Sequence, residues 1–149
     1  MLMDYYELTM SNGYFEKGFK DKMVVFDMFY RKNPDNGGFV VSAGLEQLIE
    51  YIENMHFSKE DIEFLRSKGE FSEGFLQYLA DFKFTGNIDA LPEGTICYPN
   101  TPIVTVTAPV IEAQLIETML LLTMNFQSLI ATKACLLYTS PSPRDMRRS

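Results

Sequence analysis

The chain has 149 residues, of which 46% are hydrophobic and 22% are charged, and its formal net charge is −7 at pH 7. This length and composition indicate one soluble globular domain, and the acidic balance argues against nonspecific binding to nucleic acid or to an anionic membrane. Two cysteines, Cys97 and Cys135, are too few for a disulfide framework and lack metal-ligand spacing, so we expect a reduced cytosolic setting. The start of the chain does not have the layout of a signal peptide.

The first predicted element is a helix that begins near Asp4 and stops at Gly18. Asp4 and Glu7 have the three-residue spacing of a capping box. Three large side chains recur every fourth residue and share one face: Tyr6, Met10 and Tyr14. Two phenols and a thioether make a poor core face, because each hydroxyl needs a partner. They make a better surface for stacking on a flat ring.

Two short strands are expected next, over 23–30 and 39–43, where Val, Phe, Met and Tyr are frequent. The sequence Asn-Pro-Asp-Asn-Gly-Gly at 33–38 is a strong turn signal between them, so the two strands are close enough to form a hairpin. Asp27 interrupts the first strand on one face. That face is therefore not expected to be wholly dry.

Three helices follow in the prediction. The first covers 44–54, where the apolar residues change to helical spacing. Ser58 and Asp61 frame the start of the second helix, and Gly69 marks its stop. The third covers 72–82, and its inward residues are Phe75, Leu76 and Leu79.

The remaining chain is predicted to hold strands at 84–90, 95–98 and 103–107. Pro109 then begins a long helix that runs to about 134. Its mostly inward residues are Ile111, Leu115, Leu122, Phe126, Leu129 and Ile130. The apolar run in this helix is too short and too polar to span a bilayer, so a buried helix is expected. The order of elements favours an α+β domain over a regularly alternating α/β unit.

Several of these segments resemble the nicotinate phosphoribosyltransferases. The resemblance begins with Met-Asp-Tyr-Tyr-Glu-Leu-Thr-Met at 3–10, continues with Phe-Asp-Met-Phe-Tyr-Arg-Lys-Asn-Pro at 26–34, and ends with Asn-Phe-Gln-Ser-Leu-Ile-Ala-Thr-Lys-Ala at 125–134. Each piece alone is weak, but together they cover nearly all of 1–134 in order. The resemblance implies the N-terminal domain of a type II phosphoribosyltransferase, without most of the α/β barrel that follows it.

The resemblance also implies a reaction for the parent protein. Nicotinate and phosphoribosyl pyrophosphate would give nicotinate mononucleotide and pyrophosphate in NAD biosynthesis. ATP hydrolysis through a phosphohistidine would drive the reaction, and Mg²⁺ would accompany the pyrophosphate. A cytoplasmic homodimer with a site shared between its subunits is implied, and the fragment alone is expected to be inactive. Two alternatives stay open: a sibling enzyme that uses nicotinamide or quinolinate, and a non-catalytic binding module.

Four substrate-binding residues are implied by the resemblance. Tyr6 matches an aromatic residue that stacks on the nicotinate ring in the partner subunit's site. In the related nicotinamide enzymes, Asp4 matches an acidic position near the same ring, and Arg31 matches an arginine that helps to hold phosphoribosyl pyrophosphate across the dimer interface. Lys32 beside Arg31 adds charge. The alternatives are a tyrosine that packs in its own domain, a helix cap at Asp4 and a solvated strand end at 31–32.

Other chemically active residues are expected to be structural. His56, the only histidine, lies between two predicted helices and outside every matching motif, so the coupling histidine is expected beyond this chain. Cys97 is expected to be a small core residue, and the glycines at 37–38 are no phosphate loop. Three glutamates show no catalytic pairing: Glu93, Glu112 and Glu117. Among these, Glu117 lies on a mostly apolar helix, which favours a buried, paired carboxylate.

Residues 135–145 depart abruptly from the family pattern. Their sequence, Cys-Leu-Leu-Tyr-Thr-Ser-Pro-Ser-Pro-Arg-Asp, matches the translation of a transposase-type sequencing-library adapter. We therefore expect the family domain to occupy 1–134 and an artefactual, disordered tail to occupy 135–149. The alternative is a natural tail rich in serine and proline.

Overall fold

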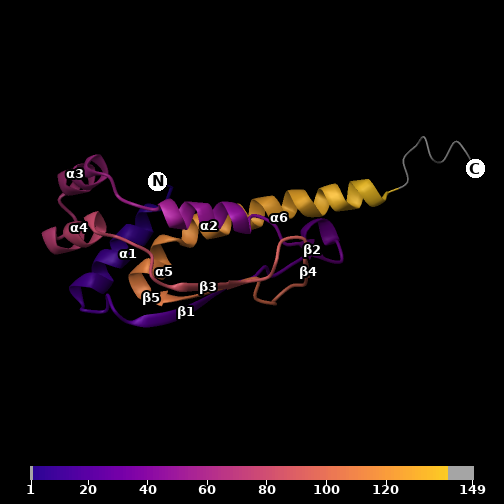
Figure 1. Ribbon diagram of the computed structural model, residues 1–149, viewed down its shortest axis with the longest axis horizontal. Helices are drawn as coiled ribbons and strands as arrows, with labels where there is room; N and C mark the ends of the chain where they lie inside the picture. The colour runs from indigo at the N-terminus through magenta and orange to yellow at the C-terminus, as the bar shows by residue number, and fades with distance from the viewer. Residues whose placement is uncertain (1, 141–149) are drawn as a thin grey trace, which may run out of the picture.

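The fold is built around a three-stranded antiparallel sheet (Figure 1). The central strand, β5 (Val104–Pro109), pairs with β1 (Met23–Met28) on one side and with β3 (Asn87–Ala90) on the other. The structure is a computed structural model and describes residues 2–140. This mixture of helices with an antiparallel sheet confirms the predicted α+β class.

One face of the sheet is buried because side chains alternate between the two faces of a strand. The buried positions of β5 are Val104, Val106 and Ala108. Thr105 points to the other face, where Asp27 lies opposite it in the register of β1. The Thr105 hydroxyl donates a hydrogen bond of 2.6 Å to Asp27 Oδ1. The expectation that the face carrying Asp27 is not wholly dry is therefore confirmed.

The predicted hairpin between 23–30 and 39–43 is wrong. β2 (Val40–Val41) pairs with β4 (Ile96–Cys97) in a separate two-stranded sheet, while β1 pairs with β5. The turn region between the strands forms a short 3-10 helix, η1 (Pro34–Asn36). Asp35 in η1 has a φ of 53°, and the chain turns there away from β1. The turn was predictable, but the pairing depends on strands far away in the sequence.

The first helix, α1 (Tyr5–Glu16), ends as predicted but does not begin as predicted. Gly18 terminates the helix with a φ of 73°, which a glycine adopts without strain. Asp4 occupies the N-cap position, but its side chain makes no capping hydrogen bond. The capping box between Asp4 and Glu7 is wrong because the Glu7 carboxylate binds Thr118, which lies on a later helix.

The next three helices are α2 (Leu45–Asn54), α3 (Lys59–Lys68) and α4 (Glu73–Ala80). Ser58 and Asp61 form the predicted capping box at the start of α3, and Gly69 ends that helix with a φ of 69°. The hydroxyl of Ser72 caps α4 by accepting a hydrogen bond from the Phe75 N–H. The core side chains of α4 are fully buried, as predicted: Phe75, Leu76 and Leu79. Local signals therefore fix the ends of these helices correctly.

The predicted long helix is divided into α5 (Val110–Leu115) and α6 (Glu117–Thr139), with a break at Ile116. Every residue of α5 is buried, including Ile111 and Leu115, which were expected to point inward. Three residues of α6 that were also expected to point inward are at least half exposed: Leu122 (50%), Phe126 (67%) and Ile130 (51%). The core is contacted by another side of α6, which carries Leu120 and Met124.

The helix α6 continues beyond the expected end of the domain. Residues 135–139 are helical, so the prediction of a disordered tail is wrong for these residues. The rest of that predicted tail, 141–149, lies outside the described residues. By length and mean hydropathy alone α6 could cross a membrane, and 28% of its apolar window is buried. The apolar run at 115–124, for which a buried helix was expected, is mostly buried, and its exposed members are Leu121 and Leu122. One such helix does not indicate a membrane protein, because core helices pass the same test.

Candidate functional site

The N-terminal turn of α1 presents Tyr6 at the junction between α5 and α6. The Tyr6 side chain is 43% exposed, so it is not a core residue. Partial desolvation, followed by the neighbouring carboxylate of Glu117, raises the pKa of Tyr6 to about 12. Asp4 and Glu7 contribute smaller effects in the same direction. The phenol is therefore neutral at physiological pH, and its ring is accessible to a ligand.

The backbone around Tyr6 is fixed by contacts with α6. The carboxylate oxygen Oε1 of Glu7, which is fully buried, accepts hydrogen bonds of 2.7 Å from both the backbone N–H and the hydroxyl of Thr118. The same Thr118 hydroxyl accepts a hydrogen bond of 3.2 Å from the Asp4 N–H. Burial raises the pKa of Glu7, and the hydrogen bonds from Thr118 oppose that rise. These contacts tie the first turn of α1 to the first turn of α6.

An apolar groove lies beside Tyr6, between β1 and the two helices α5 and α6. Its volume is about 490 Å³, and its apolar lining includes Phe26, Phe29 and Leu121. The polar side chains in the lining include Gln114 and Glu117, which are joined by a hydrogen bond of 2.6 Å. Glu117 thus lies between the groove and Tyr6. Glu117 is partly exposed and hydrogen-bonded to a neutral amide, which only partly agrees with the predicted buried, paired carboxylate.

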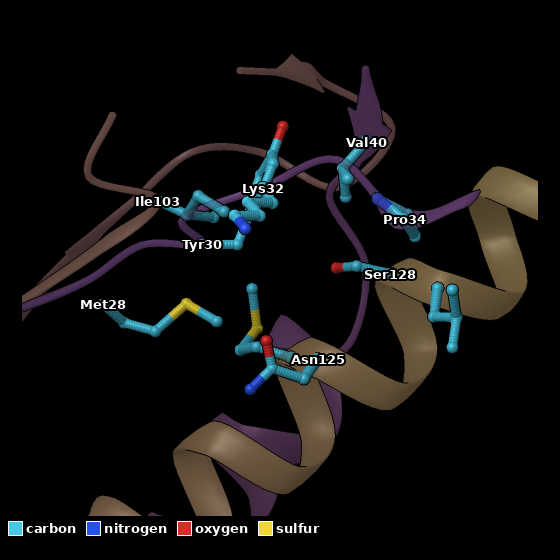
Figure 2. A pocket seen from close by; sticks show the side chains of 10 residues that line it. Met28, Tyr30, Lys32, Pro34, Val40, Ile103, Asn125 and Ser128 are labelled. Atoms are coloured by element: carbon cyan, nitrogen blue, oxygen red, sulfur yellow. The ribbon is translucent and has the colours of Figure 1, made fainter. Parts of the chain in front are cut away.

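Arg31 and Lys32 follow the C-terminal end of β1, and the side chains of both are exposed. Lys32 lines a second pocket, of about 210 Å³, together with Tyr30, Asn125 and Ser128. Figure 2 shows Lys32 and Tyr30 facing Asn125 and Ser128 of α6 across this pocket. Within 2–140, neither Arg31 nor Lys32 forms an ion pair. Both cationic side chains are therefore accessible to an anionic ligand.

The structure brings the four predicted site residues together in two pairs. Asp4 and Tyr6 lie at the start of α6, whereas Lys32, which follows Arg31 in the sequence, lines a pocket at Asn125 and Ser128 of that helix. Eight residues of α6 separate the two places, which corresponds to about 12 Å at a rise of 1.5 Å per residue. A single copy of this chain therefore presents two separate groups of candidate residues.

Sequence reasoning did not identify Glu7 and Thr118 as partners. The buried face of α1 is Glu7, Leu8 and Ser11, and it carries two polar residues. Tyr6 and Met10 are exposed, as their poor suitability for a core predicted. If Tyr6 and Met10 are assigned to the surface, few apolar residues of α1 are available to form its buried face. This shortage was the signal in the sequence that the buried face contains polar residues. That signal indicates a polar contact but does not identify the partner, which is 111 residues away.

The other glutamates are structural, as expected. Glu93 Oε1 accepts hydrogen bonds from the N–H of Gly44, the N-cap residue of α2, and from the first two N–H groups of that helix, which belong to Leu45 and Glu46. The carboxylate of Glu112 binds the backbone N–H and the hydroxyl of Thr85. Glu93 is more than a simple turn residue, because its carboxylate caps α2 from outside that helix.

His56 and Cys97 also have the structural positions that were expected. His56 is exposed between α2 and α3, and its Nδ1 lies 2.8 Å from the Asn54 carbonyl oxygen. Cys97 is 2% exposed, and burial raises the pKa of its thiol. In the part of the chain that the structure describes, no cluster of three or more histidine, cysteine or acidic residues could hold a metal ion. Mg²⁺ binding and the coupling histidine stay predictions for the complete enzyme.

The chain matches known proteins both in sequence and in fold. The family model for the N-terminal domain of nicotinate phosphoribosyltransferase matches residues 1–125. A nicotinate phosphoribosyltransferase of Mycobacterium tuberculosis is 41% identical over 134 residues, which are 90% of this chain and 29% of that protein. The enzyme of the same name from Bacillus subtilis is 43% identical over 131 residues, covering 88% of this chain and 27% of that protein.

A solved structure shows the same likeness. The crystal structure of human nicotinic acid phosphoribosyltransferase matches with a TM-score of 0.84 and 31% identity, over 90% of this chain and 27% of that one. The fold is therefore that of the N-terminal region of a phosphoribosyltransferase. The chain belongs to the nicotinate phosphoribosyltransferase family and corresponds to its N-terminal domain. It spans less than a third of the length of these relatives.

Proposed function

We propose that this chain is the N-terminal domain of a nicotinate phosphoribosyltransferase and that Tyr6 is its stacking residue for nicotinate. The observation that carries the proposal is the exposed, neutral Tyr6 ring, held on a helical turn that is hydrogen-bonded to α6. In the proposed reaction, the ring nitrogen of nicotinate attacks the anomeric carbon of phosphoribosyl pyrophosphate. Pyrophosphate leaves, and nicotinate mononucleotide enters NAD biosynthesis.

Stacking suits this reaction for a physical reason. A ring that is held by its face keeps its nitrogen lone pair free to attack in the plane of the ring. The nitrogen gains positive charge as the new bond forms, and carboxylates near Tyr6 stabilise such a charge. Asp4 and Glu117 are the nearby acidic groups. A neutral Tyr6 phenol adds no repulsion toward the carboxylate of nicotinate.

We assign the phosphate groups of phosphoribosyl pyrophosphate to Arg31, with Lys32 in support. A guanidinium donates two parallel hydrogen bonds to a pair of phosphate oxygens, whereas an ammonium supplies a less directional charge. Both side chains are exposed, and the pocket that Lys32 lines lies about 12 Å along α6 from the Tyr6 group. This separation favours a site shared between the two subunits of a homodimer, in which each chain contributes to its partner's site.

The remaining assignments concern the whole enzyme. We propose that ATP and Mg²⁺ are used by residues outside this chain, in a cytoplasmic enzyme, and that the 149-residue chain alone has no transferase activity. The relatives are more than three times as long as the part that this chain matches, which supports an incomplete site here.

The test compares the 149-residue chain with the complete gene product, using nicotinate, phosphoribosyl pyrophosphate, ATP and Mg²⁺. We expect nicotinate mononucleotide, measured by liquid chromatography, only from the complete product. Product formed by the 149-residue chain above the level of its Tyr6→Ala variant would contradict the expected inactivity. A complete product that uses nicotinamide or quinolinate in preference would support a sibling enzyme, and one with no transfer at all would support a binding module.

A further inference from the structure

We propose that Glu7 is a positioning residue that sets the orientation of the Tyr6 ring by locking the first turn of α1 onto the first turn of α6. The inference rests on the proposed role of Tyr6 in binding nicotinate. Glu7 itself is fully buried and therefore does not touch a ligand. It acts through its sequence neighbour, whose ring is exposed.

The contact has the geometry of a two-point lock. Glu7 Oε1 accepts from the backbone N–H and from the hydroxyl of Thr118, both at 2.7 Å. The hydroxyl in turn accepts from the backbone N–H of Asp4 at 3.2 Å. One threonine thus holds the residue before α1 and a side chain in its first turn. Tyr6 lies between these two points, so its backbone has little freedom to rotate.

Stability alone does not account for a carboxylate at this position. Within 2–140, Glu7 has no cationic partner, and its second oxygen, Oε2, has no hydrogen-bond partner. A carboxylate that is buried in this way costs free energy, which an apolar side chain of similar size would avoid. The carboxylate instead fixes the geometry of the contact, because its hydrogen bonds are directional and allow one arrangement of the N-terminal turns of α1 and α6. The Thr118 N–H belongs to the positive end of α6, which favours an anionic acceptor.

Two matched pairs of variants test the lock in the complete transferase. Glu7→Leu removes the acceptor, whereas Glu7→Gln keeps an acceptor oxygen. Thr118→Val removes the hydroxyl and keeps the shape, whereas Thr118→Ser keeps the hydroxyl. We expect Glu7→Leu and Thr118→Val to raise the KM for nicotinate at least tenfold, with the KM for phosphoribosyl pyrophosphate within twofold. Gln and Ser should restore most of the nicotinate affinity.

Two outcomes of the kinetic test would overturn the proposal. In the first, Glu7→Leu leaves the KM for nicotinate unchanged. In the second, it changes both KM values and kcat in parallel, which is the behaviour of a residue that only supports folding.

A second measurement uses the 149-residue chain and does not require catalysis. Tyrosines labelled with ¹³C at Cζ report the pKa of Tyr6 by NMR, and Tyr6→Phe assigns the signal. We expect Glu7→Leu to lower the pKa of Tyr6 from about 12 toward 10, because the ring leaves its desolvated place beside Glu117. Glu7→Gln, which loses only the smaller contribution of the Glu7 charge, should keep most of the rise in this pKa. An unchanged pKa in Glu7→Leu would overturn the lock even if the enzyme is active. A lowered pKa together with an inactive enzyme would retain the lock and reject the proposed function.

Discussion

Substitution of Tyr6 is expected to affect ligand binding more than the stability of the fold. Because its side chain is 43% exposed, Tyr6→Ala should change the free energy of unfolding by no more than about 1 kcal/mol. The loss of ring stacking should raise the KM for nicotinate in the complete enzyme about tenfold. Tyr6→Phe, which keeps the ring, should bind nicotinate nearly as well as the unchanged enzyme. Steady-state kinetics and thermal denaturation on the same samples separate the two effects. Unchanged KM and kcat for Tyr6→Ala would reject the stacking role.

Glu93 shows how one carboxylate can make stability depend on pH. Hydrogen bonds from the backbone N–H groups of Gly44, Glu46 and Leu45 lower the pKa of Glu93 below its ordinary value of 4.5. A lowered pKa in the folded state means that Glu93 contributes stability above about pH 4.5 and loses it as the pH falls through the folded value. Glu93→Gln should therefore lower Tm at pH 7 and have little effect at pH 3.

The control for Glu93 is Glu53→Gln at the other end of α2. The Glu53 side chain is exposed and caps no helix N-terminus. Its substitution should not reproduce the loss of Tm at pH 7 that is expected for Glu93→Gln. Circular dichroism melts between pH 3 and pH 7 measure both variants. A constant difference in Tm between Glu93→Gln and the unchanged chain across this range would show that the carboxylate charge does not matter.

At the scale of elements, α2 packs so closely on α6 that Gly44 has no room for a side chain. A Cβ atom on Gly44 would lie 2.6 Å from the Thr123 carbonyl oxygen, and its φ is 106°. Gly44→Ala should therefore cost about 2–4 kcal/mol, from backbone strain together with overpacking. Gly69→Ala is the matched control, because Gly69 has a φ of 69° and open space around it. It should cost only about 1 kcal/mol. Urea unfolding of both variants gives the difference, and equal losses would contradict the close approach.

The elements also show which parts of the fold a sequence can predict. The ends of α3 were predictable because Ser58, Asp61 and Gly69 act within a few residues of one another. The pairing of β1 with β5 was not, because the hydrogen bond between Asp27 and Thr105 joins residues 78 apart. The same reason applies to Glu7 and Thr118.

In the candidate site, the sequence identified Tyr6 and Arg31 through their motifs and the exposed face of α1 through its chemistry. It did not identify the lock beneath Tyr6, because a buried glutamate and a capping glutamate have the same local pattern. It also could not show that Asp4 and Tyr6 lie apart from Arg31 and Lys32, since that separation depends on how α6 crosses the sheet.

The whole molecule exposes an apolar stripe along α6. Its members are Leu122, Phe126, Ile130 and Leu137. A contiguous apolar surface of this kind promotes association in water.

We expect the 149-residue chain to form oligomers or aggregates as its concentration rises, as measured by size-exclusion chromatography with light scattering. Replacing Leu122, Phe126 and Ile130 together with Gln should give a monomer with a similar Tm. A monomeric unchanged chain at 100 µM, about the range in which exposed apolar surface causes aggregation, would contradict this expectation.

The position of β5 at the centre of the sheet has a consequence for biosynthesis. The ribosome delivers β1 and β3 before β5, and neither edge strand has another partner in that sheet. The helices α1 to α4 can form from local interactions while they emerge, but the sheet has to wait for residues 104–109. The nascent chain therefore carries two unpaired strands until residues 104–109 have been synthesised. A chaperone that binds extended apolar segments would find its target in this interval.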